Sequence, residues 1–284
     1  MKFFFLFLFL ASTLFSFNID IYDSTIANGK TTIVKFKKEK NTKYIKIELD
    51  KKKYRIYKHP SKEKLFYALI PINYYKKPKN IKAKIFYEES GEKKTKTVFF
   101  KVIDGKYKKE KIKVQKSKVI LNKKDKKKVA MEYKEAMDIY NHSTNKNYIT
   151  SKFTTPMQSK ITSSFGKTRI YNDTLNGYHS GTDYRAKIGT PITASNSGKI
   201  VLVKDRFYSG GSIIIDHGHG IYTCYYHMSK FNVKKSTFVK KGQVIGLSGV
   251  SGRVTGPHLH FSARVGGEQV DPLQLIELIN KNLF

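Results

Sequence analysis

Cysteine is nearly absent from this 284-residue sequence, and acidic residues are scarce. The one cysteine, Cys224, excludes an intramolecular disulfide, so the fold must be held by hydrophobic cores or by a metal ion. Asp and Glu number 22 against 55 Lys and Arg, which gives a formal net charge of +33. Residues 1–150 carry +23 of this charge and residues 151–284 carry +10. A surface of this kind favours an anionic partner and speeds the encounter with it.

Charge alone leaves several classes of partner open. Nucleic acid is the first candidate by charge, and a solvated lysine-rich surface without a specific partner is the plainest alternative. Export of the chain, for which the evidence follows, favours anionic wall polymers or lipid head groups instead. We therefore expect no nucleic acid partner, and we expect anionic wall or membrane polymers to meet the basic amino-terminal half.

Long hydrophobic runs are lacking after the first residues. Lys2 is followed by an apolar run from Phe3 to Ala11 and then by small and polar residues. This order is typical of a secretory signal peptide, here residues 1–17. The run is shorter than the roughly 20 residues of a membrane-spanning helix, which disfavours the alternative of an uncleaved anchor. We expect the mature chain to be exported.

Short segments of alternating apolar and polar residues fill residues 18–125. They predict about seven strands: 31–37, 43–49, 53–58, 65–72, 82–87, 95–103 and 111–114. This pattern favours a small, lysine-rich β-sandwich-like domain with its aromatic residues in the core and its lysines facing solvent. No catalytic constellation is visible in this part, and His59 beside Pro60 is predicted to be a surface loop residue.

A helical connector is predicted over residues 126–150. Val129, Tyr133, Ala136 and Tyr140 recur at helical spacing, with Glu132 and its neighbour Glu135 on other faces. The following residues, 141–148, are polar and have neither periodicity. Lysine then becomes rarer and glycine more frequent, so residues 151–284 are expected to form the functional domain.

Six of the eight histidines lie between His179 and His260. His258 and His260 are two residues apart at the start of an alternating segment, which places both imidazoles on one face of a strand. His179 and Asp183 add one nitrogen and one carboxylate. Two imidazoles and a carboxylate suit a zinc ion, and a fourth position left to water is typical of a catalytic site. A structural site would usually have four protein ligands, often thiolates.

The other histidines of this region have plainer interpretations. His217 and His219 lie in a predicted hairpin turn between segments 212–215 and 221–226, where histidines are usually exposed. His227 ends the second of these strands and, taken alone, is a core or edge histidine. Cys224 lies among aromatic residues in the same strand and is predicted to be a buried, inert thiol.

Residues 155–272 resemble the lysostaphin-type zinc endopeptidases, also called the LytM group. The resemblance rests on the His179–Asp183 pair, the tyrosine-rich strand that ends at His227, and the sequence of residues 255–261. Further matching segments are 161–166, 189–192, 242–246 and 270–272. Three histidine motifs in this order are a specific signal. The resemblance implies a mainly antiparallel β domain with the metal at the floor of a long groove.

The resemblance also implies a role for each site residue. His179, Asp183 and His260 match the zinc ligands, and His227 and His258 match the two catalytic histidines that line the cleft. The implied activity is Zn²⁺-dependent hydrolysis of peptide cross-links in bacterial peptidoglycan, with carboxypeptidase activity as a second option. One catalytic histidine serves as general base and the other as donor to the oxyanion or the leaving amine. The two roles are exchangeable at this stage.

The amino-terminal half bears on location and control. Its lysine-rich β domain and helical connector are similar to those that precede the catalytic domain in some Gram-negative relatives. This similarity favours direct cross-links to diaminopimelate and a periplasmic location. We also expect the amino-terminal domain to cover part of the groove.

Two other classes of function compete with the enzyme. A wall-binding regulator that activates another peptidoglycan hydrolase is one, although inactive relatives of that kind usually lack part of the ligand and histidine set. A polyanion-binding module with a structural metal site is the other, and its support is the +23 charge of residues 1–150.

Overall fold

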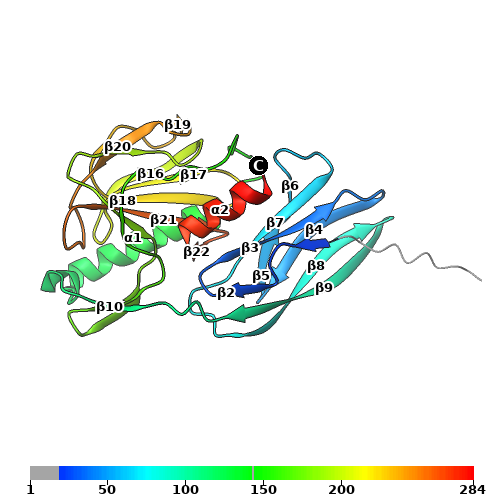
Figure 1. Cartoon of the computed structure of the whole chain (residues 1–284), viewed down its shortest axis with the longest axis horizontal. Coiled ribbons are helices and arrows are strands. Elements are labelled where there is room, and N and C mark those ends of the chain that lie inside the picture. Colours follow the sequence, from blue (N-terminus) through cyan, green and yellow to red (C-terminus); the bar gives the residue numbers. More distant parts are fainter. Residues whose placement is uncertain (1–18, 143) are drawn as a thin grey trace, which may run out of the picture.

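The computed structural model describes residues 19–142 and 144–284, which form mainly β-strands and two α-helices (Figure 1). The predicted signal peptide, residues 1–17, lies outside these described residues. Among the residues that are described, none of the helices combines the length and the apolar character that a membrane crossing requires.

Two sheets packed face to face form the amino-terminal part, at the right of Figure 1. The first sheet has the order β1 (Ile19–Ile21), β3 (Thr31–Lys37), β7 (Leu65–Pro71), β6 (Tyr57–Lys58). The second has the order β2 (Thr25–Ala27), β9 (Glu92–Ile103), β8 (Lys79–Glu89), β4 (Thr42–Leu49), β5 (Lys52–Arg55). Alternation along β9 buries Val98 and Phe100 but exposes Phe99, and the buried side chains meet Phe36 of the first sheet. The predicted β-sandwich is confirmed.

The seventh predicted strand joins a different sheet. β10 (Lys109–Ile112) pairs in parallel with β12 (Thr168–Tyr171), which pairs with β13 (Leu175–Tyr178). A short 3₁₀ turn, η1 (Lys116–Lys118), follows β10. The strand itself was predicted correctly but its place in the sandwich was wrong, because alternation indicates a strand without indicating its partner.

A ten-stranded sheet forms the carboxy-terminal part. Its main path is β11 (Ile161–Ser163), β14 (Thr182–Arg185), β21 (His258–Val265), β18 (Ile221–Phe231), β17 (Gly210–Asp216), β16 (Gly198–Arg206), β19 (Phe238–Val239). Off this path lie β15 (Pro191–Thr193), β20 (Val244–Ser248) and β22 (Glu268–Val270). Ile213, Ile215, Tyr225 and Phe261 are completely buried in its core, which fixes the strands around the candidate site.

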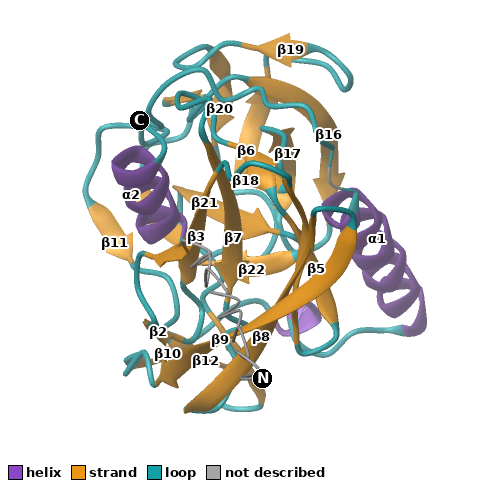
Figure 2. Cartoon of the chain, turned by 90° about the vertical axis from the view of Figure 1, so that its right-hand side faces the viewer, coloured by secondary structure: helices purple, strands orange, loops and turns teal. Residues whose placement is uncertain are grey.

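The helices α1 (Lys123–Asn141) and α2 (Pro272–Asn282) lie on opposite sides of the molecule (Figure 2). The predicted helix over 126–140 is confirmed as α1, which starts three residues earlier because the Asn122 side chain caps it. Ala136 and Tyr140 are buried. Tyr133 is instead exposed, and Glu132 is buried because its carboxylate accepts a hydrogen bond from the Phe207 amide (2.9 Å).

One hydrophobic cluster joins the two halves of the chain. Ile33 and Tyr67 of the first sheet pack with Val265 of β21 and with Leu275 and Ile279 of α2. The described halves therefore share buried contacts over α2, rather than being joined by a connector alone.

Three histidines predicted to be exposed are buried, and two of them lie at this junction. The His59 ring is 3.0 Å from the carbonyl of Asn282, and the His219 ring is 2.7 Å from the Tyr67 hydroxyl. His217 is completely buried in the carboxy-terminal part. These predictions were wrong because the composition of a turn does not show which distant element packs against it.

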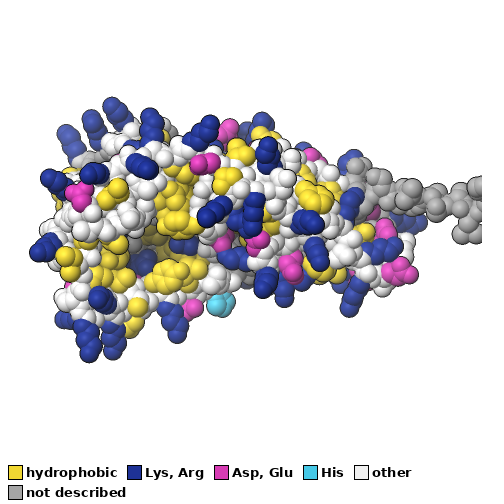
Figure 3. Space-filling view, turned by 90° about the horizontal axis from the view of Figure 1, so that it is seen from below, with side chains coloured by type: hydrophobic (Ala, Val, Ile, Leu, Met, Phe, Trp, Pro, Cys, Tyr) yellow, Lys and Arg dark blue, Asp and Glu magenta, His cyan; other side chains and the backbone are white. Residues whose placement is uncertain are grey.

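Among the charged side chains on the face drawn in Figure 3, basic ones far outnumber acidic ones. Figure 3 shows lysines and arginines over most of the face seen from below. Hydrophobic side chains gather around a hollow in its left-hand part, on the side where Figure 1 has α1 and β10.

Candidate metal centre

Three of the predicted site residues converge on one point. His179 follows β13, Asp183 lies on β14 and His260 on β21, and the last two are direct partners across the β14–β21 pair. Asp183 Oδ1 is 2.9 Å from His179 Nε2 and 2.8 Å from His260 Nδ1. The two ring nitrogens are 3.0 Å apart. Strand pairing thus brings His260 to the His179–Asp183 pair, and the three donor atoms lie as a tripod for one cation requires.

The surroundings orient these donors. His179 Nδ1 lies 2.8 Å from the carbonyl oxygen of Ser164, so this nitrogen donates its proton there and the lone pair is left on Nε2. Gly181 gives the rings room, because a Cβ at this position would lie 2.6 Å from His260 Nε2 and 2.3 Å from the carbonyl oxygen of Phe261. The glycine within the histidine motif is therefore a packing requirement of the site.

The charge state of the group fits a metal ion. Burial would raise the pKa of Asp183, but the close contacts of its carboxylate with the His179 and His260 rings outweigh burial and lower it. Burial lowers the pKa of His260 to about 4. A buried carboxylate beside a neutral imidazole is the protonation state in which such side chains bind a divalent cation. Two nitrogens and one oxygen form a donor set that zinc accepts.

His227 and His258 lie beside the three donors. Their ring centroids are 4.8 Å apart, and His258 Nε2 is 3.7 Å from Asp183 Oδ1. Each ring donates from Nδ1 to a backbone carbonyl at 2.8 Å, to Ser251 and Gly256 respectively, which leaves both Nε2 atoms as acceptors. Burial, and then the nearby histidines, lower the pKa of His227 well below its usual value. The structure thus brings all five predicted residues into one site.

Sequence reasoning missed two residues of this site. Arg169 on β12 donates to Asp183 Oδ2 at 3.1 Å, and Glu110 on β10 accepts from Arg169 Nε at 2.6 Å. Neither residue stands in a histidine motif. Glu110 reaches the candidate metal group, His179, Asp183 and His260, only because β10 pairs with β12. No sequence signal indicated that pairing.

A cavity of about 530 Å³ opens at this site. Asp183 and His258 lie on one part of its wall, residues 255–257 continue that wall, and four consecutive residues of the β10 segment, 110–113, form another part. A smaller cavity of about 130 Å³ is lined by His179, His227 and His260. Of the three donor residues, Asp183 lines the larger cavity, which has room for a peptide segment, and the two histidines line the smaller one.

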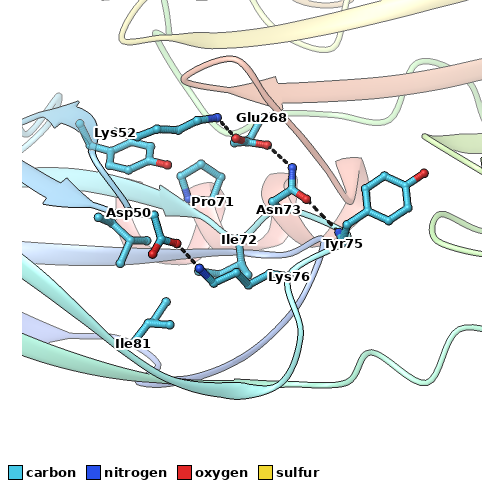
Figure 4. A pocket seen from close by; sticks show the side chains of 11 residues that line it. Asp50, Lys52, Pro71, Ile72, Asn73, Tyr75, Lys76, Ile81 and Glu268 are labelled. Atoms are coloured by element: carbon cyan, nitrogen blue, oxygen red, sulfur yellow. Dashed lines mark hydrogen bonds and ion pairs between the residues drawn. The ribbon is translucent and has the colours of Figure 1, made fainter.

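Another cavity, of about 320 Å³, lies between the amino-terminal sheets and the β21–β22 turn (Figure 4). Its charged side chains are paired with each other. Lys52 binds Glu268, which also accepts from Asn73 at 2.8 Å, and Lys76 binds Asp50. Because these charged groups bind one another, the cavity is better explained as a junction between the two halves than as a catalytic site.

Comparisons with known proteins indicate a family for the segment that carries the site. Residues 177–272 match peptidase family M23, which confirms the resemblance predicted from the histidine motifs. Peptidoglycan DD-endopeptidase ShyA of Vibrio cholerae is 43% identical over 122 residues, 42% of this chain and 28% of that protein. Lysostaphin of Staphylococcus simulans is 46% identical over 91 residues, 31% of this chain and 18% of that protein. This chain thus spans less than a third of the length of these relatives.

One solved structure is similar over most of the chain. The crystal structure of a putative peptidase M23 from Pseudomonas aeruginosa has a TM-score of 0.67 at 22% identity. The match covers 89% of this chain and 95% of that one, so the similarity in fold extends to the amino-terminal sheets.

Proposed function

We propose, from the premise that residues 177–272 form a domain of peptidase family M23, that this chain is a zinc-dependent endopeptidase of bacterial peptidoglycan. The bonds cut would be peptide cross-links. Carboxypeptidase activity is a second option, and the reaction products distinguish the two. The observation that carries the proposal is the convergence of His179, Asp183 and His260 beside two further histidines with open Nε2 atoms.

The proposed zinc ligands are His179 Nε2, Asp183 Oδ1 and His260 Nδ1, the three atoms that face one another. A zinc ion supplies Lewis acidity, which polarises an amide carbonyl and lowers the pKa of a water molecule. His258, with Nε2 close to Asp183, accepts a proton from the attacking water and returns it to the leaving amine. His227, whose ring lies beside that of His258, donates to the oxygen of the scissile carbonyl when its Nε2 carries a proton. Both rings are anchored alike, so their roles remain exchangeable.

The location follows from the substrate. Peptidoglycan lies outside the cytoplasmic membrane, and residues 1–17 read as a signal peptide, so we place the mature protein in the periplasm. There, we propose, it cuts direct cross-links and contributes to cell shape. Residues 18–125, 126–150 and 151–284 would serve as lysine-rich β domain, helical connector and peptidase domain.

The basic surface supports a further partner. The amino-terminal half carries +23, and exposed lysines lie on strands of both its sheets. We propose that it binds anionic wall or membrane polymers, which would concentrate the enzyme at its substrate. Binding to such polymers should weaken steeply with added salt. Binding that is unchanged in high salt contradicts this role.

The test of the enzymatic proposal is a paired measurement on the purified mature chain. Elemental analysis gives bound zinc, and chromatography with mass spectrometry gives the fragments released from peptidoglycan. We expect about one zinc per chain, with conversion of cross-linked fragments to monomers. His260→Ala should lose both, because it removes one of three ligands.

His142→Ala is the matched control, since His142 is exposed at the end of α1. It should keep both zinc and cleavage. If the wild-type protein is folded but neither binds added zinc nor releases fragments, the proposed enzymatic function is contradicted. A cellular role that survives His260→Ala favours the wall-binding regulator instead.

A further inference from the structure

The two oxygens of Asp183 have different partners. Oδ1 faces the two ligand histidines, whereas Oδ2 accepts a hydrogen bond from the Arg169 guanidinium at 3.1 Å. The side chains of Asp183 and Arg169 are 9% and 14% exposed, so this ion pair is largely shielded from water. A charge pair of this burial is strong enough to fix the plane of a carboxylate.

Arg169 is itself held from its other side. Glu110 Oε1 accepts from Arg169 Nε at 2.6 Å, and Glu110 Oε2 accepts from Lys167 Nζ at 3.0 Å. Burial would raise the pKa of Glu110, but the hydrogen bonds from Arg169 and Lys167 outweigh burial and lower it. The ionised Glu110 thus links β10 to the candidate metal group through one arginine.

The direction of the guanidinium matters for metal binding. An arginine beside a carboxylate tends to bind both oxygens through its two parallel N–H donors. A bidentate pair with Asp183 would occupy Oδ1, the oxygen that faces His179 and His260. Because Glu110 engages Nε, the fork of Nε and Nη2 is not available to Asp183. Arg169 contacts Asp183 through Nη2, and the oxygen contacted is Oδ2.

Ser163 joins the same network. Its hydroxyl lies 3.2 Å from Arg169 and 3.2 Å from His179 Nδ1. Ser163 therefore connects Arg169 to His179, a second proposed zinc ligand. All three network residues, Glu110, Ser163 and Arg169, precede the segment that matches the peptidase family, residues 177–272.

We propose that Glu110 is a positioning residue, which through Arg169 keeps Asp183 Oδ1 free and turned toward the two histidines, and so raises the affinity of the site for zinc. The inference rests on the proposed zinc site. According to this inference, β10, which lies on the amino-terminal side of the chain, contributes to zinc binding.

The test measures zinc binding itself. Metal-free full-length mature protein is titrated with zinc in competition with a chromophoric chelator, and the cobalt(II)-substituted protein is examined by visible absorption. Glu110→Gln should raise the zinc dissociation constant about tenfold, the lower end for lost hydrogen-bond partners of metal ligands. It should also shift the cobalt spectrum, which a loss of stability alone does not do.

Asp173→Asn is the matched control. Asp173 forms an ion pair with Lys111, the next residue of β10, at 2.9 Å on the exposed side of the strand. Removing this pair takes away an ion pair of β10 without touching Arg169, so zinc affinity should stay at the wild-type value.

A double-mutant cycle shows whether Glu110 acts through Arg169. In an Arg169→Lys background, which keeps the charge but lacks the fork, Glu110→Gln should have little further effect. Equal effects in both backgrounds, or a Glu110→Gln protein with wild-type zinc affinity and cobalt spectrum, overturn the inference while the zinc site stands. Wild-type protein that binds no zinc overturns the proposed function as well.

Discussion

At the residue scale, the site depends on backbone positions as much as on side chains. His227 adopts a φ of +63°, a left-handed conformation that costs a non-glycine residue on the order of 1 kcal/mol. The strain is sustained because Ser251 accepts a hydrogen bond from the His227 ring and Ser209 accepts one from its amide. This conformation fixes the ring beside His258, where the proposed chemistry needs it.

His217 makes a prediction about stability and pH. It is completely buried between the Ser197 carbonyl and the Thr223 hydroxyl, and burial lowers its pKa from 6.5 to about 4. The unfolded chain therefore binds a proton more readily than the folded chain. The stability that comes from the neutral ring is fully present above pH 6.5 and is lost as the pH falls toward 4.

The predicted loss from His217 between pH 7 and pH 5 is about 2 kcal/mol. Denaturant unfolding of the wild type and of His217→Gln at both pH values measures it. The variant should start less stable at pH 7 but should lose about 2 kcal/mol less on acidification. Identical pH dependence in the two proteins would show that His217 is already charged, or exposed, in the folded state.

At the scale of single elements, strand pairing explains what sequence could and could not predict. The strand that carries His258 and His260 was predicted, and so was the sharing of a face, because the two-residue period of a strand is local. The partnership of Asp183 with His260 was implied only by resemblance, since it depends on the register between β14 and β21. Cys224 is buried as predicted, because aromatic neighbours in one strand are also a local signal.

The elements that were misjudged share one cause. β10 was assigned to the sandwich, and its Glu110 was not recognised as part of the site, since a parallel pair between residues 109–112 and 168–171 leaves no mark on either segment. Glu132 on α1 was placed away from the core for the same reason: its partner, the amide of Phe207, lies 75 residues further along. Contacts between segments far apart in the chain are therefore what the sequence alone could not predict.

At the scale of the whole molecule, the two halves form a joint structure around the site. Tyr74 from the amino-terminal half stacks on Tyr178 with ring centroids 3.7 Å apart, directly next to His179. α2 buries its apolar face partly against β3, and β10 contributes to the wall of the main cavity. The amino-terminal half therefore supports the candidate metal group in addition to lining part of the main cavity.

This arrangement predicts the outcome of shortening the chain. A protein that starts at Ser151 lacks Glu110 and Tyr74 and exposes the α2 residues that pack on Ile33. We expect it to be less stable and at least tenfold less active on peptidoglycan than the mature chain, the loss typical of removing a partner of a metal ligand. Thermal unfolding and fragment release measure the two effects. Higher activity in the shortened protein would instead support an amino-terminal gate over the groove.

The central claim, that the His179–Asp183–His260 group makes this protein a zinc peptidase of the cell wall, is tested most directly on a purified, peptide-cross-linked peptidoglycan dimer. The mature chain is stripped of metal by a chelator, assayed, and assayed again after one equivalent of zinc is restored. The account predicts no cleavage without metal, and recovery of two monomers with zinc. Equal cleavage of the dimer with and without metal, or none after zinc has bound, would contradict it.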